Sequence, residues 1–270
     1  MPGTGGNLAW IVNLESMKIR ILGSGTSTGV PEVGCTCPVC VSTDPHDNRL
    51  RTSAWVQTED ATILLDCGPD FRMQMLQMNT FCKIDAVLLT HEHYDHVGGL
   101  DDLRPYSRMG EVPVYANAYT AHHLRQRMPY CFAEHKYPGV PQIRLEEVEV
   151  GMPFFIHRTE VMPLSVMHGK LPILGYRIGG RLGYVTDMLT MPEESYRLLQ
   201  GVDVLVMNAL RPQPHLSHQS IDEALRAAQR IGARTTYFIH MSHQAGLHAQ
   251  LERQLPPTVR LAYDGLEIQI

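Results

Sequence analysis

Short apolar runs recur along the chain between glycine, proline, aspartate and asparagine residues, which is the pattern of buried β-strands separated by turns. Some runs alternate polar and apolar positions, as in Lys18-Ile-Arg-Ile-Leu22, whereas others are apolar throughout. The pattern predicts strands over residues 18–22, 54–56, 62–65, 86–89, 112–115, 160–164, 174–178, 182–185, 202–207 and 236–239.

Apolar residues at helical spacing predict helices over residues 71–78, 120–128, 192–200, 221–231 and 246–254. The helix over 221–231 has the clearest start, because Ser220 stands three residues before Glu223 and the two can form a capping box. Strands dominate the first half of the chain, and strands alternate with helices in the second half. This order predicts an α/β protein with two sheets face to face and helices outside, a four-layer αββα sandwich.

The chain has no repeat and no linker rich in proline, glycine or serine, so we expect a single domain over residues 17–270. Residues 1–16 contain glycines and a short apolar patch, Leu8–Val12, with no basic residue before it. That patch is short for the apolar region of a signal peptide, and secretion is not expected. We expect residues 1–16 to be a flexible extension.

The composition is that of an ordinary soluble globular protein, with 44% hydrophobic and 19% charged residues. No run approaches the roughly 18 consecutive apolar residues of a membrane span. The net charge of −5 argues against broad affinity for nucleic acid. Six cysteines in 270 residues do not make a dense disulfide framework, so the expected location is the reducing cytoplasm.

The densest group of potential metal ligands is His91-Glu-His-Tyr-Asp-His96, directly after the apolar run over 84–89. A strand that ends in such a group presents its ligands at the carboxyl edge of a sheet, where α/β proteins place their sites. Imidazole and carboxylate suit zinc, manganese or iron(II), and four such groups can divide between two ions. A histidine-rich solvated turn is the alternative, and the density of the group favours a metal site.

Three further residues that can bind metal stand just beyond predicted apolar strands. His168 follows the run over 160–164, Asp187 ends the run over 182–186, and His240 ends the run over 236–239. A lone histidine is more often structural than a ligand, but the repeated placement at strand ends favours metal binding.

The segment Thr90-His-Glu-His-Tyr-Asp-His-Val-Gly-Gly99 resembles the signature of the metallo-β-lactamase-fold hydrolases. The resemblance implies a metallo-hydrolase domain with two divalent ions, manganese or zinc. It places one ion on His91, His93 and His168, and the other on Asp95, His96 and His240, with Asp187 bridging. Asp66 matches the family's strand-end aspartate, which orients ligands by hydrogen bonding; stabilising the turn at Gly68-Pro69 is an alternative compatible with that role.

A finer resemblance is carried by Leu22-Gly-Ser-Gly-Thr-Ser-Thr-Gly-Val-Pro31 and Gly34-Cys-Thr-Cys-Pro-Val-Cys40. Both segments are similar to those of the phosphoribosyl 1,2-cyclic phosphodiesterases. In that subgroup, three cysteines and a late histidine hold a structural zinc ion, and the matching residues here are Cys35, Cys37, Cys40 and His243. Four such ligands complete a tetrahedral shell and leave no position for substrate. The remaining cysteines are expected in the core.

The resemblance also implies a mechanism in which a bridging water, its pKa lowered by the ions, attacks phosphorus. His218 fits the place of the histidine that protonates the leaving alkoxide, as an imidazole of near-neutral pKa can do, so Asp95 and His218 are the expected catalytic residues. We interpret His215 as a loop residue. Lys170 either contacts a substrate phosphate or is solvated. Arg49 and Arg51 are interpreted as structural partners of Asp44 and Asp47.

The leading hypothesis is a dinuclear phosphodiesterase acting on a small phosphodiester such as ribose 1,2-cyclic phosphate. The expected partner is therefore a small phosphorylated substrate, neither a membrane nor nucleic acid, and a homodimer is left open. One alternative is a nuclease resembling the short tRNA 3′-processing endonuclease, against which the acidic net charge counts. Another is a noncatalytic metal-binding carrier on the same fold. The region over 106–151 carries no motif that we recognise, and substrate identity is least defined there.

Overall fold

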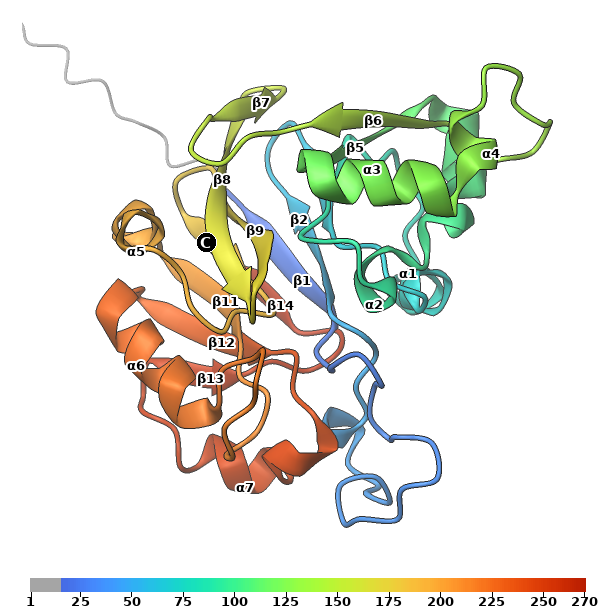
Figure 1. The fold of residues 1–270 in the computed structure, drawn as a ribbon. Helices are drawn as coiled ribbons and strands as arrows, with labels where there is room; N and C mark the ends of the chain where they lie inside the picture. Colours follow the sequence, from blue (N-terminus) through green and yellow to red (C-terminus); the bar gives the residue numbers. More distant parts are fainter. Residues whose placement is uncertain (1–15) are drawn as a thin grey trace, which may run out of the picture.

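Two seven-stranded sheets lie face to face at the centre of this computed structural model, which describes residues 16–270 (Figure 1). Across the first sheet the order is β14 (Glu267–Gln269), β1 (Lys18–Gly23), β2 (Ser53–Gln57), β3 (Thr62–Leu65), β4 (Ala86–Leu88), β5 (Val112–Ala116) and β6 (Ile143–Glu147). Across the second sheet it is β13 (Val259–Leu261), β12 (Thr235–Ile239), β11 (Val204–Asn208), β10 (Leu182–Val185), β9 (Leu171–Ile178), β8 (Thr159–His168) and β7 (Phe154–Ile156).

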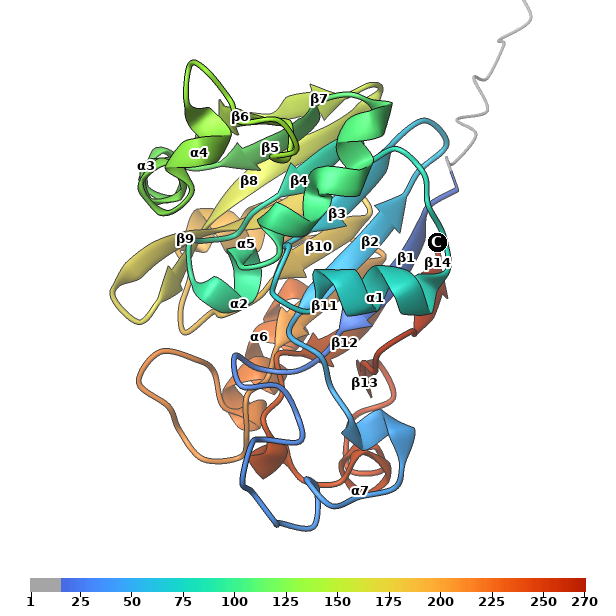
Figure 2. The same ribbon diagram turned by 90° about the vertical axis from the view of Figure 1, so that its right-hand side faces the viewer.

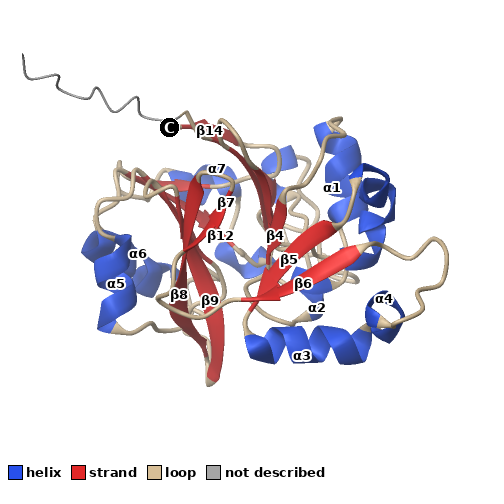
Figure 3. Ribbon diagram, turned by 90° about the horizontal axis from the view of Figure 1, so that it is seen from above, coloured by secondary structure: helices blue, strands red, loops and turns tan. Residues whose placement is uncertain are grey.

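Helices cover the outer face of each sheet (Figure 3). The first sheet carries α1 (Phe71–Met78), α2 (Tyr94–Val97), the 3₁₀ segment η2 (Leu100–Met109), α3 (Ala118–Arg127) and α4 (Pro129–Phe132). The second carries α5 (Glu193–Leu199), α6 (Ile221–Ile231) and α7 (His248–Glu252). Two further 3₁₀ turns lie in loops, η1 (Pro45–Asp47) and η3 (His243–Ala245).

Three apolar clusters hold the layers together. One fills the space between the sheets, where Ile19 and Ile63 of the first sheet join Tyr176 and Tyr184 of the second. The other two lie between each sheet and its helices. Burial of apolar area on both faces of both sheets is the main stabilising contribution. The predicted four-layer αββα sandwich is confirmed.

Each predicted strand and helix overlaps an observed element, but four strands were missed, namely β6, β7, β13 and β14. These four are the outermost strands of the two sheets. An edge strand faces solvent along one side and tolerates charged residues, and β6 reads Ile-Arg-Leu-Glu-Glu. Its apolar pattern is therefore too short to recognise. β6 and α3 also give structure to the region over 106–151, in which no motif was found.

The topology brings distant chain segments to one edge. β3 and β4 are parallel neighbours in the first sheet, and β10, β11 and β12 are parallel neighbours in the second. β8 runs in the direction of β10, because both are antiparallel to β9. The carboxyl ends of β3, β4, β8, β10 and β12 therefore carry the residues that follow them to a shared site.

Some expectations fall outside these observations. Residues 1–15 of the expected extension lie outside the described residues. Within residues 16–270, no helix is long and apolar enough to cross a membrane. The cytoplasmic location, the division into one domain and the option of a homodimer stay predictions.

Candidate metal centre

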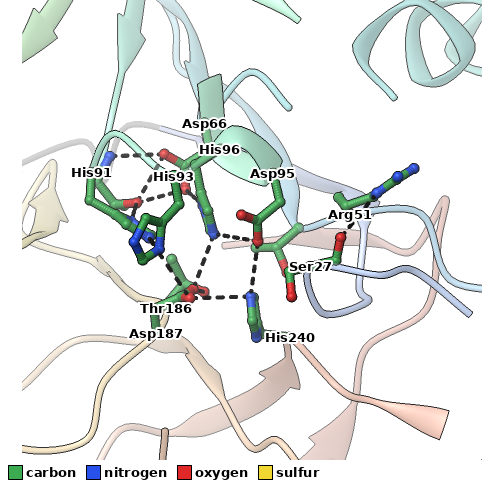
Figure 4. A network of polar contacts seen from close by, with 12 residues as sticks. Ser27, Arg51, Asp66, His91, His93, Asp95, His96, Thr186, Asp187 and His240 are labelled. Atoms are coloured by element: carbon green, nitrogen blue, oxygen red, sulfur yellow. Dashed lines mark hydrogen bonds and ion pairs between the residues drawn. The ribbon is translucent and has the colours of Figure 1, made fainter. Parts of the chain in front are cut away.

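Seven histidine and aspartate residues converge where the strand ends meet, and nearly all are buried. All of them except His168 are labelled in Figure 4. They fall into two groups, within each of which the ligand atoms lie within 4.8 Å of one another. The groups are His91, His93 and His168, and Asp95, His96, Asp187 and His240. The structure thus brings together every residue predicted for the two-ion site, and Asp187 also lies within the same range of His168 and His218.

Asp187 lies between the two groups. Its carboxylate oxygens are 3.3 Å from His96 Nε2 and 3.2 Å from His240 Nε2 in one group. The same carboxylate is 3.9 Å from His91 Nε2 in the other group. This position is the one that a bridging ligand requires.

Three residues at this edge adopt a left-handed backbone, which non-glycine residues seldom do. Asp66 follows β3 with φ 56°, Asp187 follows β10 with φ 55°, and His240 follows β12 with φ 54°. Such residues persist only where surrounding contacts impose them, and they concentrate at functional sites. The conformation turns each chain sharply as it leaves its strand, so the side chain points into the cluster (Figure 4).

Hydrogen bonds orient three of the histidine rings, those of His91, His96 and His168. The Nδ1–H of His96 donates to Asp66 Oδ2 at 2.8 Å, and the Nδ1–H of His168 donates to the Ser217 carbonyl at 2.9 Å. His91 Nδ1 is 2.9 Å from Thr90 Oγ1, which in turn donates to Asp66. With Nδ1 engaged in this way, Nε2 keeps its lone pair for a ligand bond.

Burial and charge act together on these groups. Burial raises the pKa of Asp66 and lowers the pKa of His91. Burial also opposes the charged form of His96, but the carboxylates of Asp95, Asp187 and Asp66 outweigh it and raise its pKa well above the ordinary value. No lysine or arginine within residues 16–270 forms an ion pair with these three carboxylates. The buried negative charge therefore calls for a cation at this position.

The donor set fits divalent ions. His96 Nε2 and both ring nitrogens of His240 are buried without a hydrogen-bond partner in the described chain. Buried polar atoms without partners are rare and need an explanation such as a bound ion. Neutral imidazoles and carboxylates are ligands that zinc and manganese both accept.

The predicted thiolate cluster is also assembled, away from the buried site. His243 Nδ1 lies 3.3 Å from both Cys35 Sγ and Cys37 Sγ, and Cys40 completes the group. The backbone N–H of Cys40 and the nearby His243 lower the pKa of Cys37 to about 6, whereas burial raises the pKa of Cys40 to about 11. All four residues are half-buried and the cysteines are free. Three sulfur ligands and one nitrogen in this arrangement fit a structural zinc ion.

His218 lies against both groups of the buried site. Its ring centroid is 4.6 Å from that of His168 and 4.9 Å from that of His240, and its Nδ1 is 3.7 Å from Asp187 Oδ2. Burial lowers the pKa of His218 to about 3. This shift favours the neutral form of the imidazole in the protein without bound ions.

The other basic candidates lie outside the cluster. Lys170 is exposed in the turn between β8 and β9, and His215 is half-buried with its ring 5.1 Å from that of His218. Neither arginine forms a direct ion pair with Asp44 or Asp47 within residues 16–270, although the charges of Asp264, Asp47 and Asp44 act on Arg49. Arg49 donates to Ser24 Oγ and the Ala262 carbonyl, and Arg51 pairs with Asp70 at 2.7 Å.

Sequence reasoning missed three residues that hold the ligands in place. The role of Thr90 could have been predicted from its position before His91. The acceptor at Ser217 is a backbone carbonyl, which no residue type in the sequence indicates. Arg127 of α3 donates to the Glu92 carbonyl at 2.8 Å, between two ligand histidines. A contact between residues so far apart in the chain is visible only in the fold.

Fold and site together define a metallo-β-lactamase-type hydrolase, and comparison with known proteins agrees. Residues 61–241 match the Beta-lactamase superfamily domain. The chain belongs to this superfamily.

The chain is also similar to individual proteins of known sequence or structure. It is 47% identical over 253 residues to the octanoyltransferase of Porphyromonas gingivalis, a match that covers 93% of this chain but 51% of that protein, so the chain spans about half the relative's length. The crystal structure of a diphosphatase from the PhnP family superposes with a TM-score of 0.88 and 40% identity, over 94% of this chain and 97% of that one. Zinc-bound PqqB from Methylobacterium extorquens shares the fold, with a TM-score of 0.74 and 20% identity over 93% of this chain and 99% of that one.

Proposed function

We propose that the chain is a dinuclear metal-dependent phosphodiesterase that hydrolyses a small phosphodiester such as ribose 1,2-cyclic phosphate. The observation that carries the proposal is the position of His218, a buried imidazole against His168 of one ligand group and His240 of the other. A hydrolase that must expel an alkoxide needs such a group beside the reacting phosphate. The similarity to a diphosphatase of the PhnP family supports phosphate chemistry.

In this proposal the two groups each hold one divalent ion, manganese or zinc. His91, His93 and His168 hold the first, Asp95, His96 and His240 hold the second, and Asp187 bridges them. Bound ions of this kind lower the pKa of water and neutralise charge on phosphoryl oxygens. Asp95 thus contributes to catalysis as a ligand at the site.

The chain's own residues prepare the site for that chemistry. Asp66 holds His96 and Thr90, and the Ser217 carbonyl holds His168, so the ligands are in place before substrate arrives. His218 supplies the proton for the leaving oxygen once substrate is bound. Its imidazole is neutral in the protein alone; a phosphate oxygen placed against it adds negative charge and raises its pKa toward the value that proton donation requires.

The thiolate cluster has a different part in the proposal. Cys35, Cys37 and Cys40 with His243 hold one structural zinc ion, which joins the early loop to the turn after β12. Such a closed shell stabilises the fold and leaves no position for substrate.

A substrate panel tests the function. We would measure hydrolysis of bis-(4-nitrophenyl) phosphate, ribose 1,2-cyclic phosphate, 2′,3′-cyclic nucleotides, a nucleoside diphosphate ester, a precursor tRNA and an octanoyl thioester, on protein of known metal content. We expect the protein to hydrolyse the small diesters and to leave the precursor tRNA and the octanoyl thioester intact. Turnover of the tRNA alone would favour the nuclease, turnover of the thioester alone would favour acyl chemistry, and no turnover with both groups loaded would leave a noncatalytic carrier.

His218→Ala tests the proton donor. It should lower kcat by about 10²- to 10⁴-fold for the ribose ester, whose leaving alkoxide needs a proton, and far less for the nitrophenyl ester. His157→Ala is the control, because His157 is exposed, pairs with Asp85 and lies outside the ligand cluster. Equal slowing of both substrates by His218→Ala would refute the proton-donor role.

A further inference from the structure

The loop that carries His218 is closed at its base and exposed at its tip. We define the histidine loop as residues 211–218, between β11 and α6 (the orange loop before α6 in Figure 2). Its base is joined by the Leu210 N–H, which donates to the Gln219 carbonyl at 3.0 Å, and by the Ile221 N–H, which donates to the Arg211 carbonyl at 2.9 Å. At the tip, Leu216 is 93% exposed. Within the loop, the Ser217 N–H donates to His215 Nδ1 at 3.3 Å, and its other contacts reach the segments on either side.

One side of the histidine loop faces the buried site. The Ser217 carbonyl accepts the Nδ1–H of His168, and the His218 ring lies against His168 and His240. Gly169 approaches the loop so closely that an added Cβ would lie 3.4 Å from Ser217 Cβ. A displacement of the loop would therefore move the proton donor and release the Nδ1–H of a ligand histidine at once.

The other side faces the turn that supplies His243 to the thiolate cluster. Arg211 Nη1 donates to Gln244 Oε1 at 2.6 Å, and its Nη2 donates to the Pro214 carbonyl at 3.4 Å within the loop. Ser242 adds its N–H at 3.0 Å and its hydroxyl at 3.1 Å to the Leu210 carbonyl. Gln244 and Ser242 are the direct neighbours of His243 in sequence.

Arg211 donates hydrogen bonds both to the turn that contains His243 and to the histidine loop. Within residues 16–270 it forms no ion pair with a carboxylate, and its acceptors are a side-chain amide and a backbone carbonyl. The planar guanidinium reaches both acceptors from fixed directions, whereas a lysine ammonium is a point donor on a flexible stem. Arg211 thus sets the separation between the loop and the turn.

We propose that Arg211 is a positioning residue that couples the thiolate cluster to His218. When the cluster is intact, the turn at Ser242–Gln244 is fixed, and Arg211 holds the histidine loop against the buried site. When the cluster is lost, the turn and the loop move together, and proton donation falls although the buried ligands remain. The kinetic consequence rests on the proposed function; the structural coupling does not.

Chymotrypsin cleavage after Leu216 tests the structural coupling, since its rate reports the freedom of the loop tip whatever the substrate is. Arg211→Ala and Cys37→Ser should each raise the cleavage rate, measured by mass spectrometry, about tenfold or more, with Arg211→Lys intermediate, and the double variant should add little to either. Arg230→Ala is the control, because Arg230 pairs with Glu193 on the outer helices. Unchanged cleavage in Arg211→Ala, or fully additive effects of the two changes, would overturn the proposal.

Kinetics then tests the consequence. With the buried site saturated with metal, so that the weaker support of His168 leaves both ions bound, Arg211→Ala should lower kcat for the ribose ester by about tenfold. Hydrolysis of the nitrophenyl ester should fall much less, and KM should stay nearly unchanged. Equal loss on both esters would show a general defect instead of misplacement of His218. Should the wild-type protein hydrolyse no phosphate ester, the function fails, and the cleavage result still decides the coupling.

Discussion

The buried cluster and the thiolate cluster both gather groups that bind metal, yet the chain builds them differently. The ligands of the buried cluster come from the ends of β4, β8, β10 and β12, in both sheets, and nearly all are buried. The thiolate cluster joins one short segment, Cys35–Cys40, to the turn at His243, and its residues are half-buried. The first lies at the strand ends where the two sheets meet, and the second joins two outer loops.

The difference indicates a catalytic role for the buried cluster and a structural role for the thiolate cluster. At the buried cluster, carboxylates that have no lysine or arginine partner within residues 16–270, and imidazole nitrogens without hydrogen bonds, leave charge and lone pairs for ions that remain open to substrate. At the thiolate cluster the sulfurs already accept backbone N–H groups, from Cys40 to Cys37 Sγ and from Glu32 to Cys40 Sγ. Sulfurs oriented in this way suit a closed structural shell.

Asp187→Asn should have the largest effect on activity. The carboxylate touches both ligand groups, and an amide keeps its shape but loses its charge, so diester hydrolysis should fall by about 10²- to 10³-fold or more. Metal analysis and kinetics on the small diesters measure this. Asp203→Asn, at a surface pair with Arg181, is the control. Wild-type rates in Asp187→Asn would remove the bridging role from the account.

Cys37→Ser should show the opposite balance between activity and stability. It should lose one ion per chain and lower the thermal midpoint by about 5 °C or more, with a smaller loss of activity than Asp187→Asn. Differential scanning calorimetry and metal analysis give both values. Cys82→Ser is matched, because Cys82 is a free, half-buried cysteine outside both clusters. If Cys37→Ser kept all its metal, the sulfur cluster would not be a zinc site.

Arg127→Ala should have the smallest effect of the three. It removes a support of the Glu92 carbonyl and leaves every ligand in place, so metal affinity, measured by chelator competition, should weaken by about tenfold. Arg125→Ala on the same helix is the control, since Arg125 pairs with Glu147 instead. Equal effects of the two changes would show that α3 stabilises the site only in a general way.

The two sheets also show what sequence can reveal. The inner strands carry apolar runs that predict them, whereas the four edge strands do not, because solvent on one side lets residues such as Arg260 in β13 interrupt the pattern. The contiguous group His91–His96 was readable directly. His168, Asp187 and His240 were recognised only because each ends a strand, and their convergence needed the topology and the resemblance.

Other properties of the site depend on packing alone. The left-handed backbone of Asp66, Asp187 and His240 is imposed by neighbouring strands and has no sequence signal, since none is glycine. The pKa of His218 followed from its burial between two other histidines, which no spacing in the chain indicates. The support from Ser217 is a backbone carbonyl, so any residue there would supply it.

The central claim is that the buried cluster acts as a two-ion site for phosphodiester hydrolysis. Titrating metal-free Cys37→Ser protein with manganese, while following bound metal and hydrolysis of bis-(4-nitrophenyl) phosphate together, tests it most directly. The account predicts that hydrolysis appears as the second equivalent binds and is complete at two ions per chain. Full activity with one ion bound, or no hydrolysis with two, would contradict it.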